Sequence, residues 1–300
     1  MVVPMVSASN QSSLRTRWRA PQNATVSHQV TRFALVLITG LLCLGAHAQT
    51  SKVDWVTAVV LSDLPHIDPA RISSSVQKRL SAADKFVGFE PGENRTLLRV
   101  AGGTALVSLM DTPIPNGELQ EVCQSAWYWK AACATVKDHK AHLLVVLMGT
   151  DLDKLGSAIL QTKIVAGLLE ATNAVAVYWG VNLQPRDVFL KGSTSVSRTS
   201  IPPMLWVNYQ LSRESSGNFS LSTRGLKDFG VMEIETKDAP VPGRELFDLV
   251  LGTTEYLIAN GPIIRDGDTI GQSPRQRIRV RHADSYWNAG ERVYRIEFGG

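Results

Sequence analysis

Two histidines, His139 and His142, are spaced so that they could share a metal ion if they lay on one helix. A carboxylate from elsewhere in the chain would then be the third ligand, as in many zinc sites. The same positions also suit a structural role. His139 would cap the end of a helix, where free carbonyl groups accept hydrogen bonds, and His142 would begin the next strand. We expect the structural role. The alternative is a metal-dependent hydrolase, whose carboxylate would come from one of four acidic residues: Glu118, Glu233, Asp266 and Asp268.

Two further pairs of carboxylates are candidates for binding. Glu233 and Glu235 alternate with apolar residues, so both would point to one face of a strand. They could accept a cation or a basic partner, although such a pair more often lies on the wet side of a half-buried sheet. Asp266 and Asp268 flank Gly267. This pattern could hold calcium, but Asp-Gly is also a strong signal for a tight turn, and we expect a turn.

Aromatic residues are concentrated in one predicted helix. Trp129 belongs to its apolar stripe, whereas Trp127 and Tyr128 point elsewhere. Exposed Trp and Tyr side chains are typical of protein-binding surfaces. The sequence therefore offers Trp127 and Tyr128 as binding residues, with core packing as the more common role for such side chains.

The motifs of the common enzyme classes are missing from the sequence. There is no G-x-S-x-G elbow, Walker loop, G-x-G-x-x-G, H-E-x-x-H or paired C-x-x-C. We therefore expect no cofactor, and a binding protein more readily than an enzyme.

The segment 1–48 is typical of a secretory leader. Arg32 precedes an apolar run, Phe33–Gly45, and Ala46-His47-Ala48 fits a cleavage site. The run is shorter than a membrane span, which needs about 20 residues, so we expect cleavage between Ala48 and Gln49 and a periplasmic or secreted protein. In that case the leader touches the membrane only during export. The alternative is an uncleaved leader that anchors the chain. The mostly polar segment before the apolar run is unusually long for a secretory leader, which would also fit a later start codon.

Net charge argues against a nucleic-acid partner. The chain carries 31 basic and 27 acidic side chains, and the leader holds four arginines and no acid. Without the leader the balance is 27 against 27, whereas nucleic-acid binding draws much of its affinity from excess basic charge. We expect another protein as the partner.

Cys123 and Cys133 remain after cleavage and fall within one predicted helix, 117–133. At 1.5 Å per residue their Cα atoms would lie about 15 Å apart, beyond the reach of a disulfide. The sequence thus predicts two free thiols.

The remaining chain predicts an α+β fold in which helices cover mixed sheets. We divide it into an N-terminal half, 49–190, a Ser/Thr-rich linker, 191–203, and a C-terminal half, 204–300. Asp68 and Pro69 predict a helix start. Two further helices are expected at 151–171 and 244–259. Strands are expected at 55–61, 97–100, 104–110, 142–148, 174–181, 204–212, 218–223, 231–236, 277–282 and 292–298.

A short pattern occurs once in each half. The strand 104–110 leads into Pro113-Ile114-Pro115 and a helix, and the strand 231–236 leads into Pro240-Val241-Pro242 and a helix. The prolines stiffen both connections. The pattern predicts that the two halves are related.

Several segments, in order along the chain, resemble the bacterial family called domain of unknown function 4261. They include 113–118, 129–143, 205–207, 223–235 and 266–271, and the resemblance extends from about Val56 to Phe298. The family implies no reaction, cofactor or catalytic residue. The C-terminal part is also similar to Suppressor-of-fused-like bacterial domains, which implies a binding role of the toxin-immunity kind.

Overall fold

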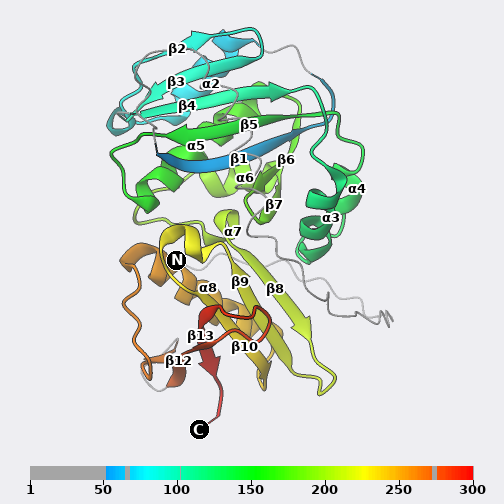
Figure 1. Cartoon of the computed structure of the whole chain (residues 1–300), viewed down its shortest axis with the longest axis vertical. Helices are drawn as coiled ribbons and strands as arrows, with labels where there is room; N and C mark the ends of the chain where they lie inside the picture. The colour runs from blue at the N-terminus through cyan, green and yellow to red at the C-terminus, as the bar shows by residue number, and fades with distance from the viewer. Residues whose placement is uncertain (1–51, 65–67, 102, 272–275, 300) are drawn as a thin grey trace. The chain divides into compact units, whose positions relative to one another are not determined.

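The computed structural model describes residues 52–64, 68–101, 103–271 and 276–299 (Figure 1). Within them, seven strands rich in Val, Leu and Ala form an antiparallel sheet with the order β2-β3-β4-β5-β1-β6-β7. The central strand β1 is apolar along most of its length, as expected for a strand covered on both faces. The strands are β1 (Val53–Leu61), β2 (Gly88–Pro91), β3 (Arg95–Val100), β4 (Gly103–Met110), β5 (Ala141–Met148), β6 (Ala174–Trp179) and β7 (Asn182–Pro185).

Helices cover both faces of this sheet. Val59 and Leu61 of β1 pack in the core that contains α2 (Pro69–Arg79), α5 (Lys154–Ala171) and α6 (Arg186–Ser193). Ala58 and Val60 point the other way, toward α3 (Asn116–Ser125) and α4 (Ala132–Val136). α2 and α5 approach so closely that a Cβ on Gly167 would lie 2.6 Å from the Cα of Val76, so a larger residue there would push the helices apart.

A second sheet follows in the chain, and in the described residues its six strands have the order β11-β12-β13-β10-β9-β8. It is mixed, because β10 pairs parallel with β13 and antiparallel with β9. α8 (Gly243–Asn260) covers one face (Figure 1) through buried Leu246, Leu249 and Val250. The strands are β8 (Asn208–Arg213), β9 (Phe219–Arg224), β10 (Glu233–Ala239), β11 (Thr269–Ile270), β12 (Ile278–Asp284) and β13 (Arg292–Glu297).

An aromatic cluster joins the two sheets. Trp55 of β1 lies 5.4 Å from the ring of Trp179 and 5.2 Å from that of Phe229, which ends the short helix η3 (Leu226–Phe229). Trp206 of α7 (Pro203–Trp206) packs on Phe229 at 5.4 Å and donates its indole N–H to Thr162 Oγ1. The described residues consequently share one continuous main core.

The predicted α+β class is confirmed. Asp68 caps α2 and Pro69 begins it, as expected. β2, β7 and η2 (Ala82–Asp84) were not predicted, and α6 and α7 overlap the two ends of the predicted linker. No helix in the described ranges is long and apolar enough to cross a membrane. The predicted leader, with the predicted cleavage site between Ala48 and Gln49, lies outside the described residues.

Both copies of the proline pattern connect a strand to a helix, namely β4 to α3 and β10 to α8. Their surroundings differ, because β4 lies between two antiparallel neighbours and β10 has one parallel neighbour. The relation between the two halves therefore stays a prediction.

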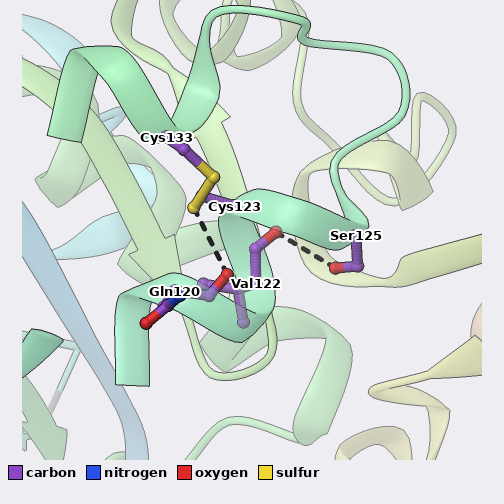
Figure 2. Close-up of a disulfide and its surroundings, with 5 residues drawn as sticks. All are labelled: Gln120, Val122, Cys123, Ser125 and Cys133. Atoms are coloured by element: carbon purple, nitrogen blue, oxygen red, sulfur yellow. Dashed lines mark hydrogen bonds between the residues drawn. A yellow bond between two sulfur atoms is a disulfide. The ribbon is translucent and has the colours of Figure 1, made fainter. Parts of the chain in front are cut away.

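The prediction of free thiols is wrong. Cys123 and Cys133 form a disulfide with Cα atoms 5.0 Å apart (Figure 2). The continuous helix assumed from 117 to 133 is broken, since α3 ends at Ser125 and α4 begins at Ala132. The chain between them turns back, and this turn brings the two cysteines together.

Replacing both cysteines by serine should lower the free energy of unfolding by about 2–4 kcal/mol, because the unfolded chain regains the freedom that the closed loop removes. Urea denaturation of the oxidised protein and of the Cys123→Ser/Cys133→Ser variant measures this difference. Equal stability, or two alkylatable thiols in the purified protein, would contradict the disulfide.

Candidate functional site

Two carboxylates are buried in the middle of the second sheet. Glu233 and Glu235 lie on β10, and their side chains are only 5% and 2% exposed. They share the face opposite α8, as the alternation predicts, but that face is not wet at these positions. The expectation of a solvated pair is wrong, because two segments fold over the carboxylates and supply hydrogen-bond donors.

Glu233 holds the turn that precedes it in the chain. Its Oε1 accepts the backbone N–H groups of Gly225 and Lys227 at 2.8 and 3.3 Å, and its Oε2 accepts the Thr223 hydroxyl at 2.8 Å. Burial raises the pKa of this carboxyl, and the donors oppose that effect. Gly225 has φ +115°, a conformation that favours glycine, so the turn depends on both residues.

Glu235 holds the connection between β12 and β13, residues 285–291, which we call the aromatic loop. The Ser285 hydroxyl and the Tyr286 N–H donate to its two carboxylate oxygens at 2.5 and 2.8 Å. Ser285 Oγ in turn accepts the N–H groups of Trp287 and Asn288. Burial raises the pKa of Glu235. The carboxylate thereby fixes the start of a loop that is distant from it in the sequence.

The outer side of the aromatic loop presents two neighbouring rings to solvent. Tyr286 and Trp287 are 43% and 42% exposed, and their ring centres are 5.7 Å apart. The Arg295 guanidinium lies 4.0 Å from the centre of the Tyr286 ring, and Lys237 Nζ lies 5.6 Å from it. Such contacts between cations and rings stabilise the arrangement.

An ion pair closes the far end of the loop. Lys227 Nζ lies 2.6 Å from Glu291 Oε1, and the Glu291 side chain is mostly buried. The two exposed rings are therefore held at both ends, by Glu235 and by Glu291. A preorganised pair of exposed aromatic side chains is a typical feature of a binding surface.

Asp266 and Asp268 form a turn, as expected. Asp268 accepts the Arg265 N–H at 2.7 Å, and Asp266 accepts the His282 N–H at 2.8 Å. Gly267 between them has φ +86°. The carboxylates of both residues thus accept hydrogen bonds from backbone N–H groups at this edge of the second sheet.

Trp127 and Tyr128 lie at the contact between the halves. The Trp127 N–H donates to Tyr209 O at 2.7 Å, and its ring packs on Phe247, although 42% of the residue is exposed. The Tyr128 hydroxyl lies 2.7 Å from Leu183 O, and burial raises its pKa. Both side chains connect the α3–α4 segment to neighbouring strands.

The two histidines bind backbone groups. His139 Nε2 accepts the Ile114 N–H at 2.7 Å, so Nδ1 carries the proton and donates to Val136 O at the end of α4. His142 is the second residue of β5, and its Nδ1 lies 3.0 Å from Thr112 O. Burial lowers the pKa of His142. Over the described ranges, no three His, Cys, Asp or Glu residues gather in a way that could hold a metal ion.

The structure thus brings together one predicted residue, Glu235, and several that the sequence analysis missed: Ser285, Tyr286, Trp287 and Arg295. A usable signal was present, since Tyr286 and Trp287 are adjacent aromatic residues in the short connection between two predicted strands.

The buried Glu233 should make stability depend on pH. Its pKa is raised in the folded protein above the ordinary 4.5, so the folded state binds more protons than the unfolded state as the pH rises above 4.5. The contribution of this group is complete below that pH and is lost as the pH rises through the raised pKa.

We therefore expect the free energy of unfolding of the wild type, relative to Glu233→Gln, to fall as the pH increases from about 4 to about 8. Urea denaturation of both proteins at each pH gives this difference, in which the other titrating groups cancel. If the free energy of unfolding of the wild type, relative to Glu233→Gln, instead rises with pH, the three hydrogen-bond donors lower the pKa of Glu233 by more than burial raises it.

The comparisons with known proteins agree with part of the predicted resemblance. No curated protein and no solved structure matches the chain. One family model matches the C-terminal part of the chain. The matched region contains the motifs at 223–235 and 266–271, and it leaves out those at 113–118, 129–143 and 205–207. It covers less than half of the 300 residues and includes β10, β12, β13, α8 and the aromatic loop. The likeness to Suppressor-of-fused-like domains stays a prediction. Residues 222–297 match the family described as Domain of unknown function (DUF4261).

Proposed function

We propose that the chain is an exported, protein-binding module of the bacterial cell envelope, and that it engages its partner through the aromatic loop. The observation that carries the binding role is the exposed pair Tyr286 and Trp287, held on the buried Glu235. Tyr, Trp and Arg are the residues that most often dominate the energy of protein interfaces, and Arg295 lies directly against the Tyr286 ring.

Export is supported by two independent features. The leader has the order of charge, apolar run and small residues of a secretory signal. The Cys123–Cys133 disulfide is a bond that persists mainly in oxidising compartments such as the periplasm. The disulfide is independent support, because the prediction of export from the sequence did not use it: the sequence predicted two free thiols.

The aromatic loop replaces Trp127 and Tyr128 as the proposed binding surface. Trp127 uses its only hydrogen-bond donor on Tyr209 O, and the hydroxyl of Tyr128 is also engaged within the protein. On the aromatic loop, Trp287 is 42% exposed, and its ring centre lies 5.7 Å from that of Tyr286. A partner can reach these two rings without breaking a contact of the core.

The export proposal predicts a processed and oxidised protein. When the full chain is expressed in a bacterium, the osmotic-shock fraction should contain a form that begins at Gln49 and carries the disulfide. Intact-mass measurement and thiol alkylation under denaturing conditions test both properties. The variant Ala48→Asp, which removes the small residue at the cleavage position, is the control and should remain unprocessed.

A stable form that begins at Met1 or Val2, with two reactive thiols, would contradict export. A full-length form in the membrane fraction would instead support anchoring by the uncleaved leader.

The binding proposal predicts that envelope partners depend on the aromatic loop. Immobilised wild-type protein should capture a reproducible partner from envelope extracts, and Tyr286→Ala/Trp287→Ala should lose at least about tenfold of it, because truncating aromatic hot-spot residues costs about 2 kcal/mol or more. Quantitative mass spectrometry measures the captured amounts.

The control variant is Phe89→Ala/Tyr256→Ala, which removes two aromatic side chains of similar exposure, 38% and 50%, on other surfaces. It should bind as the wild type does. Equal loss in both variants, or no partner at all, would argue against the aromatic loop. Thermal unfolding of each variant confirms that it is folded.

A further inference from the structure

The aromatic loop stands at the edge of a polar sheet face with an unusual distribution of charge. Strand register places one residue from each of five strands in a row across this face, on the side opposite α8. The row consists of Arg281, Arg295, Glu235, Ser222 and Gln210.

Two arginines of this row are direct cross-strand neighbours. Arg281 of β12 pairs with Arg295 of β13, and like charges at such positions are unfavourable. The carboxylate next to Arg295 is Glu235, which is buried and already accepts two hydrogen bonds from the aromatic loop. It offers no oxygen to solvent.

Two more cations lie on the same face. Arg279 is two residues before Arg281 on β12, so alternation places it beside the row. The register of β10 is irregular after Thr236, but Lys237 Nζ lies 5.6 Å from the centre of the Tyr286 ring, which places Lys237 on the same face. Both are exposed, and neither forms an ion pair with another described residue. We call Lys237, Arg279, Arg281 and Arg295 the cationic face.

Acidic side chains only partly balance these charges. Arg281 lies 3.5 Å from Asp266 and 3.9 Å from Glu297, and both carboxylates are about half exposed. Exposed ion pairs of this length contribute little energy. Glu297 is also the direct cross-strand neighbour of Arg279. Among the accessible side chains, three cations (Lys237, Arg279 and Arg281) stand against two carboxylates (Asp266 and Glu297), so the cationic face keeps a small excess of positive charge, although the chain without its leader is neutral as a whole.

We propose that the cationic face and the aromatic loop together dock an acidic segment of a partner protein. Carboxylates of that segment meet Lys237, Arg279 and Arg281, and an apolar side chain packs on Trp287. An acidic protein is favoured over a nucleic acid because the chain without its leader has no surplus of basic residues, whereas nucleic-acid binding draws much of its affinity from such a surplus. This inference rests on the proposed binding function.

A direct binding measurement tests the choice of partner. The probe is a fluorescein-labelled peptide of alternating Glu and Phe, followed by fluorescence anisotropy with the full-length, oxidised protein. We expect saturable binding that weakens as salt is raised, because exposed charges are screened. A peptide of alternating Lys and Phe and a labelled oligothymidylate should bind at least about tenfold more weakly.

Charge reversal tests the surface. Lys237→Glu/Arg279→Glu should weaken binding of the acidic peptide by about tenfold or more, because two attractions become repulsions. The matched control is Arg71→Glu/Lys78→Glu, which reverses one arginine and one lysine on α2, both exposed, and changes the net charge equally. Its binding should change less than about twofold, as expected for charges beyond the screening distance. The thermal midpoint of each variant is measured alongside.

Several results would overturn the inference: no saturable binding of the acidic peptide, tighter binding of the basic peptide or the oligonucleotide, or equal weakening in both charge-reversed variants. A captured envelope partner that needs Tyr286 and Trp287 but is unaffected by Lys237→Glu/Arg279→Glu would overturn this inference and leave the proposed function intact. If neither Tyr286→Ala/Trp287→Ala nor Lys237→Glu/Arg279→Glu lowers the capture of the partner, both this inference and the proposed function are wrong.

Discussion

The cost of burying a carboxylate organises the C-terminal part of this protein. An ionised group removed from water must be matched by hydrogen-bond donors or it destabilises the fold by several kcal/mol. Glu233 and Glu235 on β10 satisfy this demand in different ways. Glu233 collects backbone and hydroxyl donors from the turn at 223–227, and Glu235 collects them from the aromatic loop. Two loops far apart in the sequence are fixed by adjacent positions on one face of a single strand.

The sequence predicted the strand of these residues and their common face, because alternation is a local property. It did not predict their burial. Whether a sheet face is wet depends on what folds over it, and the covering segment, Ser285 and Tyr286, is distant from Glu235 in the sequence. Local pattern carries no information about such a contact. The clustering of aromatic residues pointed to Trp127 and Tyr128 as binding candidates, with core packing as the more common role, and it gave no sign of the pair at Tyr286 and Trp287.

The disulfide shows a second limit of local reasoning. The apolar stripe Leu119, Val122, Ala126, Trp129 and Cys133 keeps helical spacing through a segment that is not one helix. The chain leaves the helix after Ser125 because tertiary contacts are stronger than the local preference: Trp127 and Tyr128 reach strands of both halves through their polar atoms. Periodicity describes which residues face the core, and it is compatible with a break between them. The capping role of His139 was predictable because it needs only the adjacent helix end.

The two corrections concern the parts of the molecule that bear most directly on function. A disulfide in place of free thiols is consistent with the predicted leader. Glu235 is buried and not solvated, and its hydrogen bonds to the aromatic loop explain how the exposed rings of Tyr286 and Trp287 are held in place. Glu235 uses its oxygens on the loop, so it offers no carboxylate oxygen to a ligand at the surface, although its charge still interacts with Arg295. One buried group thus has two consequences, because it orders the aromatic loop and leaves the exposed cations of the neighbouring face accessible to a partner. A surface with both properties is suited to an acidic partner that also offers an apolar side chain.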